Sequence, residues 1–304
     1  MTRYLTLGHL LVEDTVLPDG RRLLGRLGGD CLYAAIGARA WADDVVAVAR
    51  FGPDFPPRLL ERLRDTGYAD GLIRCDHNSV RLWVHWGAEG RRRFTFREGA
   101  GTYEQQTVGP EEIPGRLSDR VQAIHIAPVP FPHMEALLRW ARARADVVTV
   151  DPHYQHVDGN LSEWRRALPL VDAFLPSRSE ATDLLGEWPG AAAAARALAE
   201  LGAPIVVVKL GAEGSLAYRA ADGSSYRVGP ARLDPVDPTG SGDAFCGGFL
   251  VGLAESGDLR LALGYGAVAA SFVASGYGCE HALEPDRPEA RKRLDELLAP
   301  RVAG

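Results

Sequence analysis

The sequence has few cysteines, and their arrangement excludes two common roles. Among 304 residues there are 4 cysteines, Cys31, Cys75, Cys246 and Cys279, with no CxxC pair and no His/Cys cluster at the spacing of a zinc site. Thiols that are so far apart are typical of proteins in a reducing compartment, where cysteines are buried as small apolar side chains. We therefore expect neither a disulfide framework nor a structural zinc site.

Long hydrophobic runs and an excess of basic residues are also absent. No run of about eighteen apolar residues occurs, and residues 1–8 contain no signal-peptide core, which predicts a cytoplasmic protein that does not contact a membrane. The formal net charge is −6. Because contacts with phosphate groups give nucleic-acid binders a basic surface, we expect no nucleic-acid partner.

Short apolar runs alternate with amphipathic stretches over most of the chain. The runs are four or five residues long and rich in β-branched side chains, as in buried parallel strands, whereas 132–145 and 191–201 have helical periodicity. Strands that alternate with helices predict an α/β fold with a parallel sheet covered on both faces. The expected strands are 45–49, 123–127, 147–150 and 204–208.

Two segments, 10–27 and 79–98, interrupt this alternation. In 79–98, apolar and polar side chains alternate on both sides of a glycine-containing turn at 87–90, which is typical of a β-hairpin. A small sheet of this kind has an apolar face that needs cover from a ligand or from another subunit. We expect a single domain over 1–304, with these strands inserted as a lid and a homodimer formed through them.

A glycine-rich stretch precedes one helical pattern. Residues 237–249, DPTGSGDAFCGGF, contain four glycines, and the residues after Asp243 recur at helical spacing, so a helix is expected to begin near Gly242. The N-terminus of a helix attracts anions, and the small residues Gly240 and Ser241 would let a phosphate approach the backbone. Asp243 could then accept the proton of an attacking hydroxyl, although the same residues could also form only a tight turn with a first-turn charge.

The letters DPTGSGD in this stretch resemble the C-terminal signature of the ribokinase/PfkB family of carbohydrate and nucleoside kinases, Asp-Thr-x-Gly-Ala-Gly-Asp. The resemblance implies that Asp243 is the catalytic base. It also implies that Gly240, Ser241 and Gly242 form an anion hole for the transferred phosphoryl group. The family fold would be a ribokinase-like α/β domain of three layers, with a parallel sheet and a small β-sheet lid. Pro238 stands where the family often has Thr, and Ser241 where it usually has Ala.

The letters GGDCLYAA, beginning at Gly28, are similar to the N-terminal Gly-Gly signature of the same family, whose glycine amides bind substrate hydroxyls. The resemblance assigns substrate binding to Gly28, Gly29, Asp30 and Tyr33, with Tyr33 at the position of the family's Asn. Asp14 resembles the substrate-binding aspartate that follows the first strand of the family. Without the resemblance, Asp30 could equally cap a helix, and Asp14 could be a solvated loop residue.

Three further stretches resemble the nucleotide-binding half of the family. Ser177 and Glu180 match Asn-x-x-Glu, with Ser in place of Asn; in the family this motif organises Mg²⁺ and phosphates, and Glu180 would act on the metal through water. Residues 209–215, KLGAEGS, are similar to the strand-end loop that contacts the nucleotide. The resemblance thus implies ATP and Mg²⁺ as cofactors and leaves a monovalent cation open. The residues it assigns to them are Ser177, Glu180, Lys209, Gly211, Gly214, Asp237 and Thr239.

The resemblance implies an ATP-dependent phosphotransferase that phosphorylates a hydroxyl of a small sugar, sugar acid or polyol. Two alternatives stay open: a nucleoside kinase, and a family member that binds a sugar or nucleotide without transferring phosphate. The departures at Tyr33 and Ser177 motivate the second alternative. The presence of Asp237 and Asp243 disfavours it, because a sensor needs no catalytic base.

Overall fold

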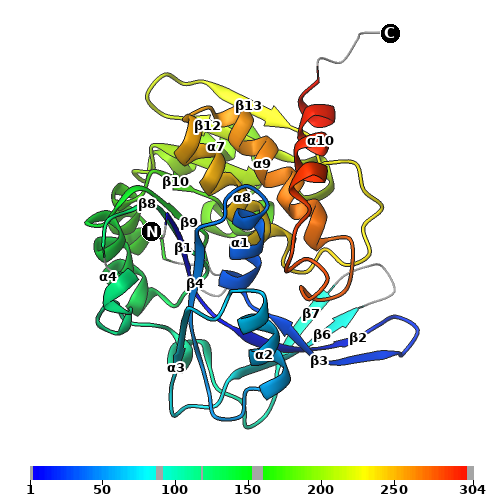
Figure 1. The fold of residues 1–304 in the computed structure, drawn as a ribbon. Helices are drawn as coiled ribbons and strands as arrows, with labels where there is room; N and C mark the ends of the chain where they lie inside the picture. Colours follow the sequence, from blue (N-terminus) through cyan, green and yellow to red (C-terminus); the bar gives the residue numbers. More distant parts are fainter. Residues whose placement is uncertain (1–2, 87–91, 118, 153–159, 300–304) are drawn as a thin grey trace.

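A nine-stranded sheet forms the centre of the fold (Figure 1). The computed structural model describes residues 3–86, 92–117, 119–152 and 160–299. Along the chain the strands of this sheet are β1 (Tyr4–Leu7), β4 (Val45–Phe51), β5 (Gly71–Arg74), β8 (Val121–Ile126), β9 (Ala145–Val150), β10 (Ala173–Phe174), β11 (Ile205–Lys209), β12 (Ser215–Arg219) and β13 (Ser225–Val228). Their order is β13-β12-β11-β10-β9-β8-β1-β4-β5, with β12 and β13 antiparallel at one edge and the rest parallel.

Helices cover both faces of this sheet, because the side chains on both sides of its strands are apolar and need cover. The expected α/β fold of three layers is confirmed, and 132–145 and 191–201 correspond to helices. One face carries α4 (Phe131–Arg142), α5 (Leu161–Ala167), α6 (Arg178–Leu185) and α7 (Ala191–Ala199). The other carries α1 (Asp30–Arg39), α2 (Pro57–Asp65), α8 (Ser241–Ser256) and α9 (Leu259–Val273), with α10 (Arg287–Leu298) packed on α9.

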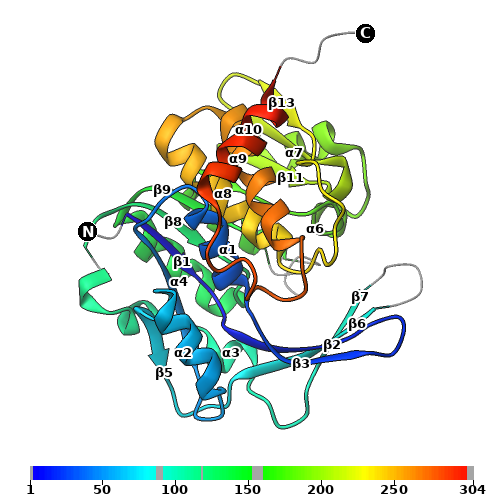
Figure 2. The same cartoon turned by 45° about the vertical axis from the view of Figure 1, so that its right-hand side comes forward.

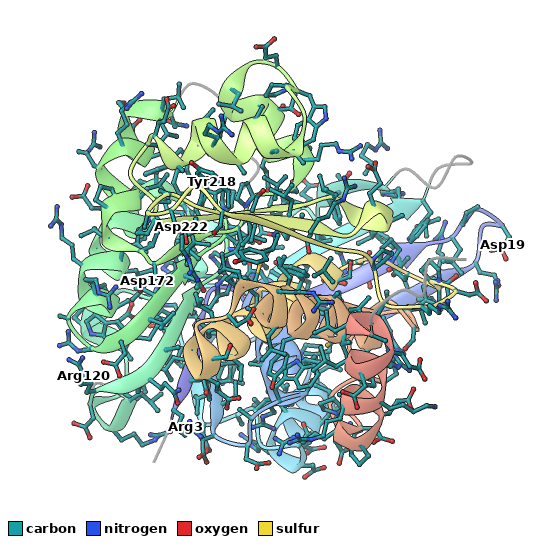
Figure 3. All side chains as sticks on the ribbon, turned by 90° about the horizontal axis from the view of Figure 1, so that it is seen from above. Arg3, Asp19, Arg120, Asp172, Tyr218 and Asp222 are labelled. Carbon is teal, nitrogen blue, oxygen red and sulfur yellow. The ribbon has the colours of Figure 1, made fainter. Side chains whose placement is uncertain are left out.

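The expected small second sheet is also present. It consists of β2 (Leu11–Val16), β3 (Arg22–Gly28), β6 (Val80–Trp86) and β7 (Arg92–Phe96) in the order β3-β2-β6-β7, and we call it the lid sheet. It projects from the main domain (Figure 2), and Asp19 in the turn after β2 marks its far end (Figure 3). The expected turn at 87–90 lies outside the described residues, and the homodimer through this sheet stays a prediction.

Helices α1 and α8 lie so close together that glycine is required at their contact. A Cβ on Gly37 of α1 would overlap the carbonyl group of Ala244, and a Cβ on Gly247 of α8 would overlap the carbonyl group of Ala34. Each overlap involves backbone, which cannot move aside as a flexible side chain does. The two helices therefore pack as one rigid unit.

The four cysteines are free. Cys31, Cys246 and Cys279 are buried, as the sequence predicts, whereas Cys75 is partly exposed. Within the described part of the chain, no helix combines the length and the apolar composition that a bilayer crossing requires.

Candidate active site

A cavity of about 180 Å³ lies between the lid sheet and the carboxyl ends of the main parallel strands. Pro128 and Pro152, which follow β8 and β9, line its floor, so it occupies the edge at which open parallel sheets bind ligands. The other lining residues are Leu11, Glu13, Leu82, Phe94, Thr95 and Phe96 from the lid sheet, and Gly29, Asp30, Tyr33, Tyr103, Glu180, Thr239, Gly240 and Asp243 from the rest of the chain.

Helix α8 begins at Ser241, one residue before the start that the sequence predicts. Gly240 precedes it with φ 74°, a left-handed conformation that favours glycine. A Cβ on Gly240 would also overlap the ring of Tyr33, so two independent constraints select glycine there. The Ser241 hydroxyl donates to the carbonyl of Pro238 at 2.7 Å, which closes the turn. Gly240 lines the cavity, whereas Ser241 and Gly242 do not, and the N–H of Ser241 donates to the carbonyl of Pro238 at 3.2 Å.

Asp237 stabilises the loop before α8 by a hydrogen bond within the loop. Its side chain is buried, and its Oδ1 accepts the N–H of Thr239 at 2.8 Å. Thr239 lines the cavity, whereas Asp237 does not. Of these two expected nucleotide-binding residues, the structure brings only Thr239 to the cavity.

The backbone at Gly242 leaves room for a Cβ, although Gly242 does not line the cavity. A Cβ placed there would meet a single neighbour, Lys209 Nζ at 3.8 Å. Asp243 follows in the first turn of α8 and lines the cavity. Burial raises the pKa of Asp243 well above its usual range, and the carboxylates of Asp151 and Asp30 raise it further, while Lys209 opposes them. A carboxylate with a raised pKa is suited to take a proton from a hydroxyl.

Asp151 belongs to this site, and the sequence analysis did not single it out. It directly follows β9, and its Oδ2 accepts a hydrogen bond from Lys209 Nζ, at the end of β11, at 2.5 Å. The other carboxylate oxygen, Oδ1, is buried and has no hydrogen-bond partner in the described chain. Burial raises the pKa of Asp151 to about 7, although Lys209 lowers it. The sequence signal that could have found Asp151 is its position directly after an expected parallel strand, where open parallel sheets bind ligands. Lys209 itself does not line the cavity.

The start of α1 forms another wall of the cavity. Gly29 lies before the helix with φ 125°, lines the cavity, and has no room for a Cβ because the carbonyl of His9 is too close. Asp30 is the first residue of α1; its Oδ1 accepts the N–H of His9 at 2.6 Å, and the residue borders the cavity. Gly28 does not line the cavity; a Cβ there would overlap the carboxylate of Glu13.

Glu13 lines the cavity in the place where Asp14 is expected. Neighbouring residues of a strand point to opposite faces, and both oxygens of Asp14 are bonded outside the cavity. Its Oδ1 accepts the N–H of Gly25 at 2.6 Å, and its Oδ2 accepts from Arg97 at 3.0 Å. The Tyr33 hydroxyl donates to Glu13 Oε2 at 3.3 Å within the cavity wall. The structure therefore does not bring Asp14 to the cavity, and it presents the preceding carboxylate instead.

Glu13 and Asp14 form a matched pair for mutation. We expect Glu13→Gln to raise the KM of the acceptor by about ten- to a hundredfold, because a charged hydrogen bond contributes about 1.5–3 kcal/mol. Asp14→Asn should leave both KM values unchanged and lower the melting temperature, because it weakens the contacts with Gly25 and Arg97. Steady-state kinetics and thermal melts of both variants measure these effects; the reverse pattern would return the binding role to Asp14.

Of the remaining expected nucleotide-binding residues, the structure brings only Glu180 to the cavity. Ser177 precedes α6 and forms a capping box: its hydroxyl accepts the N–H of Glu180 at 3.3 Å, and its own N–H donates to Glu180 Oε2 at 2.7 Å. Gly211 and Gly214 form the turn after β11 with positive φ and do not line the cavity. This turn therefore lies at the carboxyl end of β11, outside the cavity.

The family model described as pfkB family carbohydrate kinase matches residues 15–287. The chain belongs to this family. This pfkB family kinase is 28% identical to the cytidine kinase of Thermococcus kodakarensis over 282 residues. The match covers 91% of this chain and 98% of that protein. The match confirms the family that the sequence motifs indicate and the enzyme class, a carbohydrate or nucleoside kinase.

Solved structures agree with this kinase in fold. A fructokinase from Xylella fastidiosa with bound ATP superposes with a TM-score of 0.78 at 19% identity, covering 97% of this chain and 99% of that chain. The nucleoside kinase of Burkholderia thailandensis, in complex with inosine, superposes with a TM-score of 0.77 at 16% identity, covering 97% and 98%. At these identities the likeness concerns the fold, and the expected fold class is confirmed.

Proposed function

We propose that this kinase transfers the terminal phosphoryl group of ATP to a hydroxyl of a nucleoside. The observation that carries the choice of acceptor is the aromatic wall of the cavity. Phe94 and Phe96 line it from β7, with exposed fractions of 47% and 41%, and the ring of Tyr103 meets that of Phe96 edge to face at 5.4 Å. Leu11 and Leu82 extend the same wall. Exposed aromatic rings gain most when another flat ring covers them, which favours an acceptor that carries a base.

Carboxylates make the rest of the cavity lining polar and negative. Glu13 lies on the lid sheet, paired with Leu82, whereas Asp30 and Asp243 lie on the main domain, and carboxylates bind the hydroxyl donors of a sugar strongly. Together with Glu180, these carboxylates create a negative potential that disfavours an anionic acceptor such as a sugar acid. A neutral sugar joined to a flat base matches the carboxylates and the aromatic rings of this lining. The cytidine kinase and the inosine-bound nucleoside kinase among the similar proteins support the same acceptor class.

The chemistry rests on the first turn of α8. The oxygen of the acceptor hydroxyl bonds to the terminal phosphorus of ATP while the bond from that phosphorus to the bridging oxygen breaks, so that ADP leaves with the bonding electrons. Asp243 accepts the proton that leaves the hydroxyl. The N–H groups of Gly240 and Gly242 would stabilise the charge that spreads over the phosphoryl oxygens in the transition state, whereas the N–H of Ser241 donates to the carbonyl of Pro238 at 3.2 Å. The lid sheet excludes water, which would otherwise compete as the acceptor.

The residues at the cavity fit a magnesium ion that arrives with the nucleotide. Among the described residues, no group of three or more His, Cys, Asp or Glu side chains could hold a metal by itself. Mg²⁺ commonly keeps several waters and binds to one or two carboxylates and to substrate phosphates. Glu180, acting through water, would hold the ion beside the phosphates. The bound ion would neutralise phosphate charge.

The test is a panel of acceptors with ATP and Mg²⁺, in which ADP release and phosphorylated product are measured. Cytidine, uridine, adenosine and inosine represent nucleosides; ribose, fructose, myo-inositol and 2-dehydro-3-deoxygluconate represent the other classes. We expect at least one nucleoside to exceed every other acceptor in kcat/KM by about tenfold or more, as burial of an aromatic ring implies. A sugar, polyol or sugar acid that surpasses all nucleosides would overturn the acceptor class, and inactivity with every acceptor would overturn the kinase reaction itself.

Phe96→Ala makes the same test specific to the aromatic wall. It should raise the KM of the preferred nucleoside and leave the KM of ATP unchanged. Trp83→Ala is the control, because Trp83 lies on β6 next to Leu82 and so points to the opposite face of the lid sheet. Equal effects of the two substitutions would show that the wall acts through lid stability rather than through contact with the base.

A further inference from the structure

We propose that Lys209, held in place by Asp151, is a positioning residue for phosphoryl transfer: its buried ammonium group supplies fixed positive charge beneath the first turn of α8. The inference rests on the proposed kinase reaction and adds a component that lies outside the cavity wall. Lys209 does not line the cavity, so it acts through α8 rather than by touching the phosphates.

The position of the ammonium group is set by the main sheet. Lys209 ends β11, and Asp151 directly follows β9, with β10 between these two strands. The N–H of Lys209 donates to the carbonyl of Pro176 at 2.9 Å, and the N–H of Asp151 donates to that of Ile126 at 3.0 Å. The backbone of both residues is thereby fixed. Their side chains meet at 2.5 Å, with exposed fractions of 13% for Lys209 and 4% for Asp151.

The pair is also in contact with α8. The thiol of Cys246, three residues after Asp243 and therefore on the same side of the helix, lies 3.5 Å from Lys209 Nζ and 3.5 Å from Asp151 Oδ2. Lys209 Nζ also lies 3.8 Å from the position of a Cβ on Gly242. Burial raises the pKa of Cys246, so its thiol is neutral and Lys209 is the cation beneath the helix.

The charge balance of the site explains why a cation is needed there. Carboxylates reach Asp243 from three directions: Asp30 from α1, Asp151 from the end of β9 and Glu180 from α6. The transferred phosphoryl group adds further negative charge, while a helix N-terminus offers only about half an elementary charge. Lys209 is the cation that opposes these groups at Asp243. Without it, the carboxylates would repel the phosphates and retain a proton on the base.

Asp151 has the complementary task of keeping the ammonium group charged in a buried place. Burial by itself lowers the pKa of Lys209, but Asp151, helped by the carboxyl groups of Glu180 and Asp243, outweighs it and raises the pKa above the usual range. His125 on β8 adds no charge, because burial and the nearby Lys209 lower its pKa to about 3. The ammonium group of Lys209 is therefore charged at every pH at which the enzyme would work.

The first experiment separates turnover from binding in Lys209→Met. Removal of a direct donor to developing negative charge costs about 10²–10³ in kcat. Lys209 acts from one layer further away, so we expect kcat to fall by roughly ten- to a hundredfold, with the KM values of ATP and acceptor within about twofold of wild type. A change in KM with kcat unchanged would overturn the proposal.

The second experiment excludes a purely structural role. A lone buried Asp151 is destabilising, so the double variant Asp151→Asn/Lys209→Met removes both charges and should regain thermal stability relative to Lys209→Met. We expect its kcat to stay low. Recovery of kcat to within about twofold of wild type would show that the pair only stabilises the fold and would overturn the proposal.

Lys209→Arg supplies the third measurement, because it keeps the charge at the same position. It should retain a clearly larger share of kcat than the double variant, and an equal loss in both would contradict a role for charge. Wild-type turnover, measured in the same assay, keeps this test separate from the proposed function. If wild type is inactive, the kinase reaction fails; if wild type is active and the double variant matches it, only the role of Lys209 fails.

Discussion

Asp243→Asn is expected to lower kcat by about 10²- to 10⁴-fold, the range that loss of a general base produces. The amide has the size and shape of the carboxylate but cannot accept the proton of the acceptor hydroxyl. The cavity and the amides of α8 should be preserved, so the KM values of ATP and acceptor should change little. Steady-state kinetics with the preferred acceptor and a thermal melt of the variant measure the two effects.

The pH dependence of wild type adds a second readout for Asp243. The base must be ionised to work, and its pKa is raised by burial and by the neighbouring carboxylates. As the pH falls through this raised pKa, Asp243 takes up a proton and kcat should fall, at a higher pH than for an ordinary aspartate. Asp295→Asn, at an exposed position on α10, serves as the control and should keep the wild-type profile. A kcat near wild type in Asp243→Asn would remove this residue from the role of base.

Gly242→Val is expected to have the next largest effect, a loss in kcat of about 10²–10³-fold with an almost unchanged melting temperature. The protein leaves space at this position, since a Cβ would meet only Lys209 Nζ at 3.8 Å. The backbone of Gly242 is helical, so valine can adopt it. The added side chain would instead crowd the ammonium group of Lys209 and hinder the approach of the phosphoryl group to the N–H of Gly242.

Gly240→Val is the matched comparison for that result. Gly240 has φ 74°, and a Cβ there would overlap the ring of Tyr33, so valine should lower the melting temperature as well as activity. Kinetics and thermal melts of both variants separate a blocked anion site from a strained turn. Strong destabilisation by Gly242→Val would mean that the space at Gly242 is needed by the fold and not by the phosphate.

Sequence motifs predicted those parts of the site whose geometry is set by neighbours along the chain. The start of α8 lies within one residue of the expected position. The prediction is this close because the glycines, the helical spacing and Asp243 all lie within one short segment. The turn at Gly29 and the start of α1 at Asp30 are local in the same way. The fold class follows from the alternation of strands and helices, which is likewise a short-range pattern.

The missed parts of the site depend on register and on contacts between distant segments. Glu13 lines the cavity and Asp14 does not, because neighbouring strand residues face opposite ways and the sequence does not tell which way. The sequence does not single out Asp151, because its role depends on the contact with Lys209, which is 58 residues away in the chain. For Lys209, the motif located the residue correctly at the end of a strand, but the direction of its side chain depends on Asp151.

The close contact of α1 with α8 has a consequence for how new acceptor preferences can evolve. At Gly37 and Gly247, the helix that begins at Asp30 packs against the helix that carries Asp243. A substitution at this contact would therefore displace Asp30 and Asp243 together. The lid sheet carries the aromatic wall on separate strands and has no part in that contact. A mutant library for a different acceptor should therefore vary Leu82, Phe94 and Phe96 and leave both helices untouched.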